Sequence, residues 1–336
     1  MDVPEGYKQG CGFEDACDFD KAFRSIAENL NSAEILYPAV GAFSQNMERV
    51  HFLPRFILET LWGYSIANRC LGSMSVPGGF FIPFITGIPT EDALQATGSE
   101  EFVIQYHTKL RTYFALLNQN GIETHFDAMW RKMCNLVEHV SMDPDEVIAG
   151  PGIDALYFSM VLNSYAAFET LASDMWVAVL NWKPSLYDRF VKSEDTKVTV
   201  GDMAKFGFDL RTRMGDFLRE TNTSSFGSLN AIKRSYMSVF GQPIEAAFTG
   251  HHINRTEKTR HLIAHRAGLI DNAFIEDSKK WNDFGPFIEG DYLRLHGSQV
   301  RNLVDACVKT AVDLIKAVDE WISRNEKPPR TNAKSS

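Results

Sequence analysis

The sequence predicts an all-α protein, and three observations lead to this prediction. Apolar residues recur at helical spacing in one segment after another along the 336-residue chain. Patterns typical of strands are rare, and the one short candidate, at 292–295, lies within a loop of about 30 residues. A C-terminal segment, 299–322, carries a continuous apolar stripe on one helical face. We expect a helical bundle preceded by a mainly helical N-terminal region.

The N-terminal region, 1–150, contains several predicted helices of unknown role. They cover 19–30, 52–71, 100–118 and 125–140. Pro54 fits the first turn of the second, since proline lacks only an N–H that is unpaired there anyway. An aromatic loop at 76–89 is interrupted by prolines and glycines, so it cannot cross a bilayer as a helix.

A second domain is expected over 153–325, followed by a polar tail over 326–336. The segment 141–152 is rich in proline, glycine and acids and is the best linker candidate. Helices in the second domain are predicted over 153–180, 203–219, 229–240, 254–267 and 299–322. Gly268 stands where a left-handed residue would end the fourth of these, with Leu269 folding back on the helix.

Composition restricts the classes of function. Hydrophobic residues make up 44% of the chain, which excludes a disordered protein. With 34 basic and 43 acidic residues the net charge is -9, which argues against a protein that coats nucleic acid through a global positive field. A local basic site remains compatible with this charge. We find neither a membrane span nor a signal-peptide pattern and expect a cytoplasmic location without membrane association.

The five cysteines are scattered, and no pair has the spacing of zinc ligands. Reduced thiols are the simplest interpretation. A disulfide between Cys11 and Cys17 is the alternative, and Cys307 is expected in the core because it lies on the apolar stripe of the last helix.

One short segment concentrates positive charge and imidazoles. Four of the nine histidines fall within 251–266. The same segment carries one acid, Glu257, and four cations: Arg255, Lys258, Arg260 and Arg266. Its apolar content is too low for a core helix, so it must present a polar face.

Two chemical interpretations of this helix remain open beside a purely structural one. Arg260 offers a fixed fork for a phosphate, and His265 offers proton transfer near neutral pH, which together suit metal-free cleavage of RNA. Alternatively, His261 and His265 lie one turn apart and bind a metal, although Leu262 stands where zincins carry glutamate. In the structural interpretation, the segment is a solvated basic helix that forms ordinary salt bridges.

The order Arg260-His261-Leu262-Ile263-Ala264-His265 resembles the Arg-x4-6-His motif of the HEPN superfamily (higher eukaryotes and prokaryotes nucleotide-binding). The segment around Ser164 and Glu169 looks like the opening helix of such domains. The resemblance covers about residues 153–325. It implies an all-α domain, frequent homodimers with a composite cleft, and metal-independent RNA cleavage in toxins and defence effectors. Other members are inactive binding modules for RNA, nucleotide or protein.

Carried onto this chain, the resemblance implies Arg260 and His265 as the catalytic pair and His261 as the intervening polar residue. We expect the neighbouring cations Arg255, Lys258 and Arg266 to contact RNA phosphates. Glu169 or Asn163 would be a supporting polar group from the first long helix. No metal or cofactor is expected, and the expected partners are RNA, a second copy of the chain and a neutralising or regulatory protein.

Overall fold

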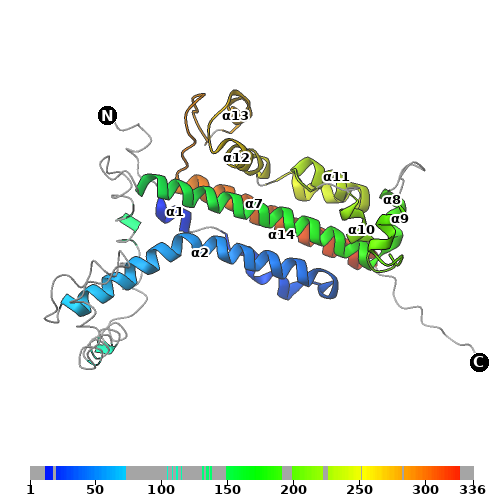
Figure 1. Cartoon of the computed structure of the whole chain (residues 1–336), viewed down its shortest axis with the longest axis horizontal. Coiled ribbons are helices and arrows are strands. Elements are labelled where there is room, and N and C mark those ends of the chain that lie inside the picture. Colours follow the sequence, from blue (N-terminus) through cyan, green and yellow to red (C-terminus); the bar gives the residue numbers. More distant parts are fainter. Residues whose placement is uncertain are drawn as a thin grey trace, which may run out of the picture. The chain divides into compact units, whose positions relative to one another are not determined.

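The structure, shown in Figure 1, is a computed structural model that describes residues 12–17, 20–72, 149–190, 199–221, 226–250, 252–281 and 284–325, with single positions between 104 and 137. Most of these residues are helical and hardly any are in strands, so the all-α prediction is confirmed. The helices are α1 (Phe13–Cys17), α2 (Ala33–Gly72), α7 (Ala149–Trp182), α8 (Tyr187–Phe190), α9 (Val200–Lys205), α10 (Met214–Glu220), α11 (Leu229–Phe240), α12 (Ile253–Arg266), α13 (Asn272–Ser278) and α14 (Gly297–Asn325). Short 3-10 turns cover Ala22–Ser25, Ala27–Asn29, Pro184–Leu186 and Gln242–Phe248.

The chain divides into two compact units. One comprises residues 1–14 and 53–147, and the other residues 15–52 and 148–336. One junction lies close to the expected boundary near residue 150. The sequence grouped 15–52 with the N-terminal region, whereas these residues cluster with the C-terminal helices. The second unit contains every candidate site residue.

Two long helices, α7 and α14, form the centre of the second unit and lie side by side (green and red in Figure 1). The apolar stripe predicted for the last helix is buried along its whole length, from Val300 to Ile322, and includes Cys307 as expected. The facing side of α7 buries an equally apolar set, including Tyr157, Met160, Phe168, Leu171 and Met175. Helices α10 and α12 pack against α7, and α12 also packs against α14.

Helix α11 is fixed to α7 by two buried hydrogen bonds. The indole N–H of Trp176 donates to the carbonyl of Ser235 (3.1 Å), and the hydroxyl of Tyr236 donates to the carbonyl of Ala172 (2.6 Å). Both aromatic side chains are fully buried. Each therefore contributes its large apolar surface to the core without leaving its polar atom unpaired.

Helix α10 approaches the backbone of α7 closely through Gly215. A Cβ atom at this position would lie 2.3 Å from the carbonyl oxygen of Val177, so only glycine fits. The side chain of Asn181 accepts from the Gly215 N–H (2.8 Å) and donates to Asp216 (2.8 Å), which ties the first turn of α10 to the end of α7.

The start of α2 is anchored on α14 by Asp319. This buried carboxylate accepts hydrogen bonds from the backbone N–H groups of Asn31 (3.1 Å) and Ser32 (2.7 Å) and from the Asn31 side chain (2.8 Å). Asn31 and Ser32 directly precede Ala33, the first residue of α2. The Ser32 N–H is one of the donors at a helix start that have no partner within the helix, and Asp319 supplies its acceptor. The carboxylate therefore holds the segment that leads into α2 against α14.

The helix predicted over 203–219 is two helices. Helix α9 ends at Lys205 because Gly207 and Phe208 both adopt left-handed backbone angles (φ 62° and 57°), and α10 begins only at Met214. A non-glycine aromatic residue in this region is strained, and the sequence pattern gives no signal of it.

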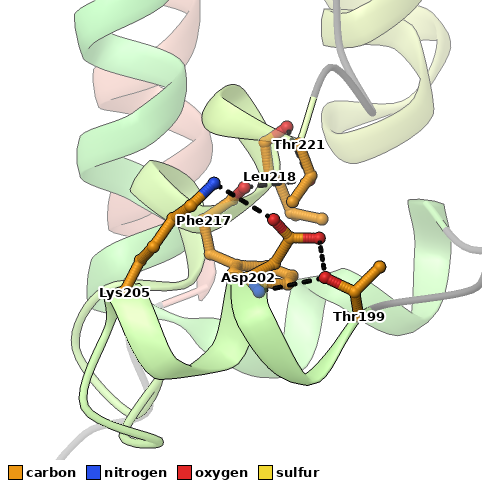
Figure 2. Close-up of polar contacts among 6 residues, drawn as sticks. All are labelled: Thr199, Asp202, Lys205, Phe217, Leu218 and Thr221. Atoms are coloured by element: carbon orange, nitrogen blue, oxygen red, sulfur yellow. Dashed lines mark hydrogen bonds and ion pairs between the residues drawn. The ribbon is translucent and has the colours of Figure 1, made fainter.

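Helix α9 has a local cap that Figure 2 shows. The hydroxyl of Thr199 accepts from the backbone N–H of Asp202 (3.0 Å) and donates to its carboxylate (2.6 Å), to which Lys205 also donates (3.2 Å). The hydrogen bond from Thr199 and then that from Lys205 lower the pKa of Asp202. This cap stabilises a helix of only six residues that buries no side chain of its own.

Three N-terminal expectations also differ from the structure. Two 3-10 turns replace the helix predicted over 19–30, and α2 begins at Ala33, so Pro54 lies deep inside it instead of in a first turn. The expected linker 141–152 ends early because α7 begins at Ala149. The helices predicted over 100–118 and 125–140 are described only at single positions, which are helical, and the aromatic loop at 76–89 lies outside the described residues.

Within the described residues, Cys17, Cys134 and Cys307 are buried and take part in no disulfide. Cys11, the partner that the alternative would give Cys17, lies outside the described residues. Burial raises the pKa of the Cys307 thiol to about 12, which makes it unreactive. Across the same residues, no helix combines the length and the apolar character that a membrane crossing requires.

Candidate functional site

Helix α12 is short and polar and lies against α7 and α14. The hydroxyl of its buried Thr256 donates to the carbonyl of Leu303 in α14 (3.1 Å), which fixes the rotation of the helix. At its end, Ala267 and Gly268 take left-handed angles, and the Gly268 N–H donates to the carbonyl of Leu262 (3.2 Å). Gly268 is left-handed as predicted, but the C-cap of the helix is Ala267, one residue earlier.

The residues after the end of α12 differ in exposure. Leu269, which the sequence predicted to fold back on the helix, is 37% exposed, and the next residue, Ile270, is buried. Gly268 is close to Phe158 of α7, where a Cβ would meet the ring at 3.1 Å.

Arg260 points from α12 toward α7 and forms an ion pair with Glu169 (Nη2 to Oε2, 3.2 Å). The side chains are 26% and 17% exposed, so the pair is shielded from much of the solvent. The Arg260 guanidinium also lies 5.6 Å from the centre of the fully buried Tyr165 ring, one turn before Glu169 on α7. Two interactions from one helix thus hold the arginine in place.

Glu169 is in an unusual electrostatic position. Desolvation by burial raises its pKa, as does the nearby Glu257, while Arg260 opposes this rise. Its second oxygen, Oε1, is buried and has no hydrogen-bond partner, and the same holds for the hydroxyl of Tyr165. Buried polar groups are usually paired, so their presence beside Arg260 marks this spot as a candidate site.

The two histidines on α12 lie on its exposed side. His261 and His265 are one turn apart, and the centres of their rings are 4.5 Å from each other. Both are accessible to a ligand from solvent. In the described part of the chain, no group of three or more histidine, cysteine or acidic side chains gathers where it could hold a metal ion.

The other predicted cations have different surroundings. The structure buries Arg255, which is 7% exposed with its guanidinium 5.5 Å from the centre of the Phe284 ring, so it lies away from the exposed histidines and is not placed for phosphate contact. Lys258 pairs with Asp277 of α13 (2.8 Å). Arg266 is exposed and lies 3.5 Å from Asp271.

Of the two supporting residues proposed on α7, the structure brings only Glu169 to Arg260. Asn163 is exposed and lies roughly 120° around the helix from Glu169. The single acid of the basic segment, Glu257, accepts from the backbone N–H of Leu229 at the start of α11 (2.7 Å). It therefore has a structural role as a cap.

Sequence reasoning missed Tyr165 and Tyr292. Tyr165 was within reach, because it stands four residues before Glu169 and so shares its helical face. Tyr292 is brought to the end of α12 by an antiparallel bridge to Leu269. The short strand considered at 292–295 is reduced to this single bridge, and no local pattern identifies Leu269 as its partner.

The side chains that α12 carries are of the types that bind phosphate and transfer protons. Arginine has five N–H donors, and the ion pair with Glu169 engages Nη2, so Nε and Nη1 can meet an anion. Neighbouring imidazoles are suited to proton transfer near pH 7.

Comparison of the chain with protein-family models, with curated proteins and with solved structures gave no match in any of the three.

Proposed function

We propose that this protein is a metal-independent endoribonuclease of the HEPN type, with α12 as its catalytic helix. The observation that carries the proposal is the position of Arg260, held half-buried by Glu169 on the helix that exposes His261 and His265 side by side. Cleavage by an internal ribose hydroxyl requires a cation for the phosphate and groups that transfer protons, and α12 carries side chains of both kinds.

In the proposed reaction, the ribose 2′-hydroxyl gives its proton to His265 while its oxygen attacks the adjacent phosphorus. The bond from phosphorus to the 5′ oxygen breaks, and His261 gives that oxygen a proton. The products are a 2′,3′-cyclic phosphate and a 5′-hydroxyl. Arg260 donates to a non-bridging phosphate oxygen and stabilises the charge that grows in the transition state.

Arg266 and Lys258 are the proposed contacts to neighbouring phosphates, each in competition with its acidic partner, Asp271 or Asp277. The net charge of -9 disfavours RNA elsewhere on the surface, so binding should be confined to this site and should weaken steeply with salt. The resemblance further suggests a homodimer with a composite cleft, a role in defence or toxicity in the cytoplasm, and control by a neutralising protein.

The test incubates purified protein with mixed RNA in EDTA and follows fragment ends. We expect wild type to cleave the RNA and both Arg260→Ala and His265→Ala to lose cleavage. The control is Arg211→Ala, which removes an exposed arginine paired with Asp209 and should cleave as wild type does. If the cleft is composite, mixing the two inactive variants restores activity. Intact RNA with wild type, or equal cutting by all variants, refutes the proposal.

A second candidate is a non-catalytic module that binds RNA, nucleotide or a protein partner. The observation that favours it is that Arg260 is already paired with Glu169 in the free chain. It predicts thermal stabilisation by RNA without any product and loss of that stabilisation in Arg260→Glu. Cleavage by wild type under the conditions above refutes it.

A further inference from the structure

A short backbone pairing extends the end of α12. Leu269 and Tyr292 form an antiparallel bridge. Two backbone hydrogen bonds enclose the bridge, from Leu293 N–H to Gly268 (2.7 Å) and from Ile270 N–H to Asp291 (2.9 Å). Leu269 and Tyr292 are therefore the non-hydrogen-bonded pair, the type in which opposite side chains lie closest together.

The two side chains of this pair face solvent. Tyr292 is 66% exposed and Leu269 is 37% exposed, whereas their neighbours Leu293 and Ile270 are 1% and 4% exposed. Buried neighbours and paired backbone hold the backbone of both residues in place, so little backbone entropy is lost when a ligand covers their side chains. We call this exposed pair the Tyr292 platform.

The platform adjoins the proposed catalytic groups along the chain. Arg266 precedes Leu269 by three residues, and the Leu269 N–H donates to the carbonyl of Arg266 (2.9 Å). His265 is the residue before Arg266 and is exposed. An RNA strand held at α12 can therefore reach the Tyr292 ring with an adjacent nucleotide.

The charges around the platform differ on its two sides. Cationic Arg266 lies toward α12, while the exposed acids Glu289 and Asp291 flank Tyr292 in its own loop. A phosphate is attracted to the first side and repelled by the second, whereas a neutral base is accepted by both. The backbone of a bound strand would follow α12 and place only a base over the ring.

We propose that the Tyr292 platform, Tyr292 with Leu269, stacks against an unpaired base of the substrate, so that the ligand of this site is single-stranded RNA. The inference rests on the proposed function and names its substrate class. Stacking on an aromatic ring tolerates any base but requires that the base be free of its complementary strand. A duplex would also bring the phosphates of its second strand against Glu289 and Asp291.

The test measures binding without turnover. The probe is a fluorescently labelled 2′-O-methyl RNA strand, which has no free 2′-hydroxyl and cannot be cleaved, and the readout is anisotropy with the full chain. The variants are Tyr292→Ala, Tyr292→Phe and, as a matched control, Ile288→Ala, which removes a 67% exposed apolar side chain from the same loop. The same strand is also presented as a duplex and as an abasic strand that keeps only the phosphates.

Tyr292→Ala should weaken binding of the single strand on the order of 10-fold, while Tyr292→Phe and Ile288→Ala stay within about 2-fold of wild type. The abasic strand should bind weakly and equally to wild type and Tyr292→Ala, and the duplex should bind weakly to all proteins. The inference is overturned if wild type and Tyr292→Ala bind the single strand equally well. It is also overturned if Tyr292→Phe loses as much affinity as Tyr292→Ala, or if the duplex binds tightly. Sedimentation adds one further check, because a dimer that dissociates in Tyr292→Ala would assign the platform to a second copy.

The two proposals fail separately. If natural RNA is never cleaved while Tyr292-dependent binding of the uncleavable strand is observed, the enzyme proposal fails and the platform stands. If RNA is cleaved in an Arg260-dependent way and Tyr292→Ala binds the strand as wild type does, only the platform fails.

Discussion

Replacing Asp319 with alanine tests how strongly the start of α2 is held on α14. The carboxylate accepts three hydrogen bonds, from the Ser32 N–H, the Asn31 N–H and the Asn31 side chain. Asp319→Ala removes both carboxylate oxygens and with them all three hydrogen bonds.

The structure allows the loss to be apportioned. Ser32 is 4% exposed, so its N–H would be left buried and unpaired, at a cost of about 1–3 kcal/mol. Asn31 is exposed, and water can replace its lost partner, so it adds only about 1 kcal/mol. The expected total is about 2–4 kcal/mol. Asp319→Asn keeps one acceptor but turns an amide N–H₂ toward the donors of Asn31, and about half the loss is expected.

The assay is urea unfolding at pH 7 followed by circular dichroism, together with hydrogen exchange of the amides at 31–36. The matched control is Glu320→Ala, which removes the neighbouring acid from an exposed ion pair with Arg324 and should change stability by less than about 0.5 kcal/mol. We expect a lower midpoint and faster exchange at 31–36 in Asp319→Ala. A midpoint no lower than that of Glu320→Ala would refute the argument that α14 anchors α2.

Two further predictions concern carboxyl groups whose pKa is raised. Burial raises the pKa of Asp154 from 3.8 to about 6, so the folded state binds this proton more tightly than the unfolded state, and the group costs stability as pH rises from about 4 through 6. Asp154→Asn should therefore stabilise the protein by roughly 1 kcal/mol at pH 7, after a discount for partial exposure, and should leave its stability unchanged at pH 3.5. Thermal melts at both pH values test this. Burial also raises the pKa of Glu169, and a protonated Glu169 loses its ion pair with Arg260. RNA cleavage that depends on Arg260 should therefore fall as pH drops through the pKa of Glu169, and Glu169→Gln should cleave about 10-fold more slowly than wild type. The pH profile of Glu169→Gln should lack this fall at low pH, and a profile identical to that of wild type would show that Glu169 does not position Arg260.

Parts of the fold could be predicted because the signals are local. Helix α11 has the predicted bounds, since Ser228 caps its first turn and Gly241 takes a positive φ at its end. The stripe of α14 and the Gly268 cap of α12 were predictable for the same reason: periodicity and cap residues act within a few positions of the chain.

Other parts depend on contacts between distant residues. The start of α2 is set by Asp319, almost 290 positions later, and its continuation through Pro54 overrides the usual preference of proline for a first turn. The break at Phe208 is a strained conformation that the pattern does not encode. At the start of α2, the contact with α14 outweighs a local preference of about 1 kcal/mol. The Phe208 side chain is 62% exposed, so core packing does not explain its left-handed backbone angle.

For the candidate site, the sequence by itself determined which chemical groups share α12: a guanidinium, two imidazoles one turn apart, and a glycine that ends the helix. The tertiary structure alone decided where each group points. It directed Arg260 to Glu169 and Tyr165, buried Arg255 against Phe284, and brought Tyr292 beside Leu269. The reason is physical: helical periodicity fixes angles around one axis, whereas burial and pairing depend on the neighbouring helices that the fold supplies.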